Sequence, residues 1–139
     1  MFVIDHRREF IVNKIASRIG SGMSLIIGAM AIFAGGQVLL GQLPDYYVID
    51  WLPVYNFLMG VVSVLITAIL LWKRHHLAKT ATLATLGLHT LVMLVLRTAY
   101  SDVVAPDSLR AMTLRISVWV IISVLTFIPA RGLTTAADD

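Results

Sequence analysis

Four long stretches that are almost free of charge dominate this sequence. Residues 19–44 and 51–72 contain no acidic or basic side chain, and two shorter stretches cover 80–96 and 116–130. About 20 helical residues cross a hydrocarbon core of roughly 30 Å. The pattern therefore predicts four membrane spans, near residues 20–43, 52–72, 80–100 and 111–130. The last two reach full length only if Arg97 and Arg115 lie just inside an interface and extend outward.

The expected fold class is all-α, an integral membrane up-down four-helix transmembrane bundle with short connections. Apolar residues make up 58% of the chain and charged residues 14%, which excludes an ordinary water-soluble enzyme. The absence of cysteine excludes disulfides and thiolate metal sites. We expect one transmembrane domain over 1–139, with a basic, amphipathic cytoplasmic segment at 1–18 and a cytoplasmic tail at 131–139.

The positions of lysine and arginine predict the orientation of the chain. With a cytoplasmic N-terminus, eight of the cations lie on the inner side and three on the outer side. The inner set is Arg7, Arg8, Lys14, Arg18, Lys73, Arg74, Lys79 and Arg131, and the outer set is Arg97, Arg110 and Arg115. Both termini are then expected in the cytoplasm.

Small residues recur at helical spacing on the first two spans. Since lipid provides no hydrophobic gain for helix association, such stripes favour close backbone packing. We expect the two stripes to face each other in an antiparallel pair. The first stripe is Ser17, Ser21, Ser24, Gly28, Ala31 and Gly35, and the second is Asn56, Gly60, Ser63 and Thr67.

Several charged residues and four of the aromatic residues, Tyr46, Tyr47, Trp51 and Tyr55, gather toward the predicted outer face, whereas Trp72 marks the inner end of the second span. A charged cap is expected, in which guanidinium–carboxylate pairs fasten the two outer loops to the bundle, or which serves as a docking patch or an entry site for an anion or proton. The cap residues are Arg97, Arg110, Arg115, Asp45, Asp50, Asp102 and Asp107. The aromatic residues predict an interfacial belt or a face for a partner subunit: Tyr46, Tyr47, Trp51, Tyr55, Trp72 and Trp119.

His89 is the one histidine within a predicted span and the one candidate for holding a cofactor. A transmembrane haem normally needs two facing axial ligands, so we expect no haem and no other cofactor. Instead, we expect the His89 imidazole to bond to a threonine or a backbone carbonyl. The sequence contains no recognisable catalytic motif or metal-site motif, which favours a protein that is not an enzyme.

The segment Ala111-Met-Thr-Leu-Arg115, followed by Trp119, resembles small bacterial inner-membrane proteins of four spans, and the outline of the chain is similar to the DoxX-like group. The resemblance implies a multi-pass protein of the bacterial inner membrane and an accessory role beside a larger membrane assembly. It implies no reaction and no catalytic residue.

Three functions are consistent with these features. The first is a non-catalytic accessory or assembly subunit of a larger bacterial membrane complex. The second is a small oligomeric transporter or channel that uses Arg97, Arg115 and the polar face at His89, and the third is a redox anchor associated with haem or quinone. The expected partners are the lipid bilayer and other membrane subunits or further copies of the chain, and not nucleic acid.

Overall fold

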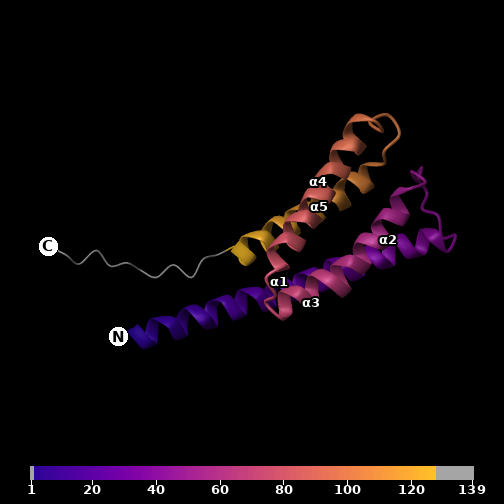
Figure 1. Cartoon of the computed structure of the whole chain (residues 1–139). Helices are drawn as coiled ribbons and strands as arrows, with labels where there is room; N and C mark the ends of the chain where they lie inside the picture. Colours follow the sequence, from indigo (N-terminus) through magenta and orange to yellow (C-terminus); the bar gives the residue numbers. More distant parts are fainter. Residues whose placement is uncertain (1, 128–139) are drawn as a thin grey trace.

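The computed structural model describes residues 2–127, and describes side chains from residue 13 onward. Every regular element in this range is helical (Figure 1). The elements are α1 (Phe2–Leu39), α2 (Leu52–Val62), η1 (Ser63–Thr67), α3 (Ala68–Trp72), α4 (Ala78–Thr98) and α5 (Pro106–Phe127). Because α2, η1 and α3 follow one another without a break, they form a single rod from residue 52 to residue 72.

The prediction of four membrane-spanning helices is confirmed. The described residues contain four helices that are long and apolar enough to cross a bilayer: Asn13–Leu39, Leu52–Trp72, Ala78–Thr98 and Pro106–Phe127. The first helix ends at Leu39, four residues before the predicted end of the span, because the chain turns at Gly41, whose φ is +87°. The fourth helix starts earlier than predicted, at Pro106, a residue suited to a first helical turn. The expected tail at 131–139 lies outside the described residues.

Helix α1 and the α2–α3 rod pack through the two stripes of small residues. With 38 residues, α1 is about 57 Å long, nearly twice the thickness of a hydrocarbon core. Its serines donate hydrogen bonds to carbonyl groups of the facing rod. These bonds run from Ser17 to Leu71, from Ser21 to Ala68 (2.7 Å) and from Ser24 to Ser63 (2.9 Å). The three serine hydroxyls of the first stripe are therefore satisfied within the interface.

Glycines bring the two backbones into direct contact. A Cβ atom added to Gly60 would lie 2.7 Å from both the Gly28 carbonyl oxygen and the backbone nitrogen of Ile32. A Cβ on Gly35 would lie 2.6 Å from the carbonyl oxygen of Pro53. These spacings leave no room for a side chain, so this pair is held by close van der Waals approach.

The second span contains one turn of π-helix, η1, which no prediction anticipated. The Ser63 carbonyl accepts a hydrogen bond from the Ala68 N–H and another from the Ser24 hydroxyl of α1. The extra residue of the bulge thus stands where the second span meets α1. The hydroxyl of Thr67 and the indole N–H of Trp119 are the buried polar groups without a hydrogen-bond partner among the described side chains.

Helices α4 and α5 form the second pair. In Figure 1 this pair separates from α1 and α2 toward the ends that carry the two longer loops. Near the other end, Leu71, Ala78 and Trp119 belong to one buried apolar cluster. Toward the loops, the pairs are joined by larger side chains, including Leu52, Leu96 and Met112. Long side chains therefore bridge the pairs where the backbones diverge.

Candidate functional site

A layer of polar and aromatic side chains, formed by His89, Tyr55 and Trp119, joins the two helix pairs at about the middle of α4. His89 of α4 is almost fully buried, and its Nδ1 shares a hydrogen bond with the hydroxyl of Tyr55 from α2. The two rings meet edge to face, with centroids 5.7 Å apart, and the imidazole lies 6.3 Å from the ring of Trp119. The layer therefore connects three helices.

The predicted partner of His89 was wrong. The nearby Thr82 and Thr85 hydroxyls donate instead to carbonyls one turn back on their own helix, at 2.8 and 2.9 Å. A threonine in a helix can donate to a carbonyl of its own helix, so these hydroxyls are satisfied without the imidazole. The hydrogen-bond partner of His89 comes from another helix. Tyr55, expected in the interfacial belt, is that partner.

Arg115 lies inside the protein. It follows Pro106 by nine residues, about 14 Å along α5, and only 7% of it is exposed. Its Nη1 donates a hydrogen bond to the side-chain oxygen of Asn56 on α2. The expectations that this guanidinium extends outward and pairs with a carboxylate are both wrong. Asn56 points inward from α2, whereas Asp45 and Asp50 are exposed on the loop before it.

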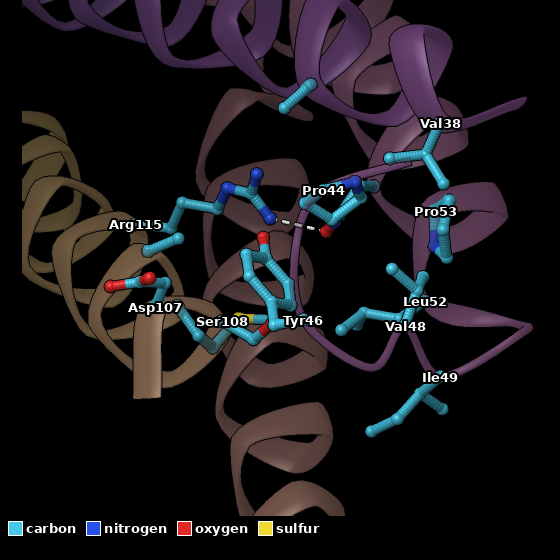
Figure 2. Close-up of a pocket in the computed structure, with 14 residues that line it drawn as sticks. Val38, Pro44, Tyr46, Val48, Ile49, Leu52, Pro53, Asp107, Ser108 and Arg115 are labelled. Atoms are coloured by element: carbon cyan, nitrogen blue, oxygen red, sulfur yellow. Dashed lines mark hydrogen bonds between the residues drawn. The ribbon is translucent and has the colours of Figure 1, made fainter. Parts of the chain in front are cut away.

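A small cavity lies beside this guanidinium (Figure 2). Its volume is about 110 Å³, and its walls come from the end of α1, the following loop, α2 and α5. Figure 2 shows Arg115 reaching from α5 toward Asn56, with the ring of Tyr46 close to the guanidinium in this view. The apolar part of the wall includes Val48, Leu52 and Met112. The cavity thus combines one buried cation with a mostly neutral lining.

The carboxylate at this cavity already has a partner. Asp107 lies in the first turn of α5 and accepts a hydrogen bond from Arg110 at 3.1 Å. Both side chains are largely exposed, at 62% and 81%. The pair lies within one helix, so it does not fasten a loop to the bundle as expected. The buried Arg115 is left with a neutral amide as its hydrogen-bond partner among the described residues.

The other residues of the predicted charged cap do not gather around Arg115. Arg97 is exposed in the last turn of α4. Asp102 is exposed as well, and the Ser101 hydroxyl lies 3.3 Å from its carboxylate. The predicted cap is therefore not one cluster: Arg115 is buried, and the other members are exposed.

The aromatic residues divide between surface and interior. Tyr46, Tyr47 and Trp72 are exposed, as a belt requires. Trp119 is fully buried, so its assignment to the belt was wrong. Trp51 is partly buried, and its indole N–H donates to the hydroxyl of Tyr100 at 3.2 Å, a contact for which the sequence held no signal.

A guanidinium in this position is suited to holding an anion. It carries five N–H donors, and one of its nitrogens is bonded to Asn56. The remaining donors match the paired oxygens of a carboxylate or a phosphate. The geometry supports recognition of a small anionic group.

Comparison of the chain with protein-family models, with curated proteins and with solved structures finds no match. The resemblance of Ala111–Arg115 and Trp119 to small bacterial inner-membrane proteins of four spans, and of the outline of the chain to the DoxX-like group, therefore remains a prediction.

Substitution Tyr55→Phe is expected to lower the free energy of unfolding by about 1–2 kcal/mol, because it leaves Nδ1 of a buried His89 without its partner. Denaturant titration of the purified protein in detergent measures this loss. Tyr47→Phe is the matched control, since it removes the hydroxyl of an exposed tyrosine. Equal stability of the two variants would contradict a structural role for the Tyr55–His89 bond.

Proposed function

We propose that this chain is a non-catalytic membrane protein that binds a small anionic group, a carboxylate or a phosphate, at Arg115. One observation carries the proposal: a buried guanidinium borders a cavity and has a neutral amide as its partner. An unbalanced charge inside a membrane protein is costly, and such residues commonly mark ligand or ion sites. A bound anion would supply the missing charge.

The size of the cavity sets the size of the ligand. Its volume of about 110 Å³ exceeds that of one water several-fold. Pockets for drug-sized molecules are larger, about 300–1,000 Å³. A carboxylate or phosphate group fits this space, with Val48, Leu52 and Met112 available to contact a short apolar substituent.

This proposal is nearest to the anion-handling alternative predicted from the sequence, but it uses a smaller set of residues. Arg97 is left out because it is exposed on the last turn of α4. His89 is left out because it does not line this cavity; its Nδ1 is bonded to Tyr55. The accessory-subunit role stays a prediction, for which co-purification of a stoichiometric partner in mild detergent is the test.

The binding proposal is tested by anion-dependent thermal stability of the purified full-length protein. At constant ionic strength, acetate or inorganic phosphate is expected to raise the melting temperature of the unchanged protein and of the control Arg97→Gln, but not of Arg115→Gln. A ligand at one hundred times its Kd stabilises by about 2.7 kcal/mol, which corresponds to several degrees. Equal stabilisation of Arg115→Gln, or no stabilisation of the unchanged protein by either anion, would overturn the proposal.

We also propose a bacterial inner membrane location with both termini in the cytoplasm, supported by the excess of cations at one end. Because the chain has no cysteine, Ser101→Cys and His76→Cys each introduce one unique thiol at an exposed position. The two positions lie beyond opposite ends of α4. A membrane-impermeant maleimide is expected to label intact cells at Ser101→Cys and to reach His76→Cys only after permeabilisation. The reverse pattern would overturn the orientation, and labelling of both in intact cells would overturn the four-span arrangement.

A further inference from the structure

A second, larger cavity lies at the opposite end of the helices. Its volume is about 410 Å³, and α1, the turn after α3, the start of α4 and the end of α5 all contribute to its wall. Its lining includes Ser17, Leu71, Lys73, His75, Lys79 and Leu125. It is independent of the Arg115 cavity and shares no lining residue with it.

Among residues 13–127, the charged side chains that line this second cavity are all basic. Lys73, Arg74 and Lys79 line it together with His75. Lys14 and Arg18 of α1 belong to the same end of the protein. Among residues 13–127 the acidic side chains lie in the opposite loops or at the start of α5: Asp45, Asp50, Asp102 and Asp107. The described carboxylates thus lie at the end of the helices that is away from this cavity.

The cations are positioned by aromatic rings and by the turn. The guanidinium of Arg18 lies 4.9 Å from the ring centre of Trp72, and the ammonium of Lys79 lies 5.3 Å from that of Phe127. The turn bends at Arg74, whose φ of +52° lies in the left-handed region. This bend brings Lys73 and His75 to the same cavity.

The cavity also has an apolar side. Leu71, Ala78 and Leu125 form part of its wall, and the neighbouring Trp72 is 58% exposed at the end of the second span. Tryptophan at the end of a span lies at the level of the lipid headgroups. A ligand that enters here meets cations at one side and apolar side chains at the other, which matches a phospholipid better than a free ion.

We propose that this cavity binds the phosphate group of an anionic phospholipid. Basic pockets between transmembrane helices at the headgroup level recognise lipid phosphates in this way. Lys73 and Lys79 would contact the phosphate, while Leu125 would contact the start of an acyl chain. The inference does not depend on the anion site at Arg115, because the two cavities lie at opposite ends of the bundle.

Native mass spectrometry of the full-length protein, released from detergent with added phosphatidylglycerol or phosphatidylcholine, tests this inference. The protein is expected to retain phosphatidylglycerol in preference to phosphatidylcholine. The double variant Lys73→Gln/Lys79→Gln is expected to bind phosphatidylglycerol about thirtyfold more weakly. Lys14→Gln/Arg97→Gln removes the same charge outside the cavity and is the matched control, and Lys73→Arg/Lys79→Arg is expected to restore binding.

Each alternative result overturns the proposal. Equal retention of the two lipids would mean that the cavity does not select an anionic headgroup. Equal weakening by the control variant would indicate a general charge effect and not this cavity. In a separate arm with inorganic phosphate, binding of free phosphate as strong as binding of the lipid would assign the site to a soluble ion. Lack of rescue by the arginine pair would show that the charge of these two positions is not what binds.

Discussion

Replacing Gly60 with leucine is expected to cause the largest loss of stability among single substitutions in the membrane spans. A Cβ at this position would lie 2.7 Å from the backbone of α1, at Gly28 and Ile32. Backbone atoms cannot rotate out of the way, so the helices must separate. Separation also breaks the hydrogen bonds that Ser21 and Ser24 donate across the interface. Overpacking together with these lost bonds is expected to lower the free energy of unfolding by about 3 kcal/mol or more.

Gly87→Leu provides the matched control. It introduces the same side chain into another membrane span, but nothing lies within 4 Å of the added Cβ. Leucine is the better helix former by about 1 kcal/mol, so this variant is expected to be neutral or slightly more stable. Tryptophan fluorescence during denaturant titration in detergent compares the two proteins. An unchanged unfolding midpoint for Gly60→Leu would contradict direct backbone contact between α1 and the second span.

The architecture could be predicted because its signals are local. A run of uncharged residues long enough to cross a bilayer identifies a span without reference to any other part of the chain. The spacing of Ser21, Gly28 and Gly35 likewise marks one side of a helix by itself. Each feature can be recognised from a few consecutive helical turns of the sequence. The structure contains the corresponding helices and their contacts.

The polar partners could not be predicted because they depend on how the two helix pairs are rotated against each other. His89 and Tyr55 lie 34 residues apart in the chain, and Arg115 and Asn56 lie 59 residues apart. Carboxylates were the expected partners of Arg115, whereas Asn56 was expected only to be a small packing residue on the second span. The π-helix at Ser63–Thr67 had no marker, because that segment contains neither proline nor glycine.

Removing one or the other partner of the Arg115–Asn56 contact is expected to have unequal effects on the free energy of unfolding, and one of them is large. Asn56→Leu is expected to lower the free energy of unfolding by about 3 kcal/mol, because it leaves a buried guanidinium without its hydrogen-bond acceptor. Arg115→Met removes the same bond together with the charge, and it is expected to leave stability nearly unchanged or to increase it. The control Gln37→Leu replaces an amide of α1 that makes no side-chain hydrogen bond in the described structure and is expected to change stability little.

The double variant separates the cost of the charge from the value of the bond. If the penalty of Asn56→Leu arises from the stranded cation, adding Arg115→Met removes that penalty and returns the protein to the stability of Arg115→Met alone. If the bond itself provides the stability, the two single variants lose equal amounts and the double variant recovers nothing. Denaturant titration of the four proteins in one detergent distinguishes these outcomes. Recovery in the double variant would mean that Arg115 is a destabilising charge, which is the condition under which a bound anion stabilises the fold.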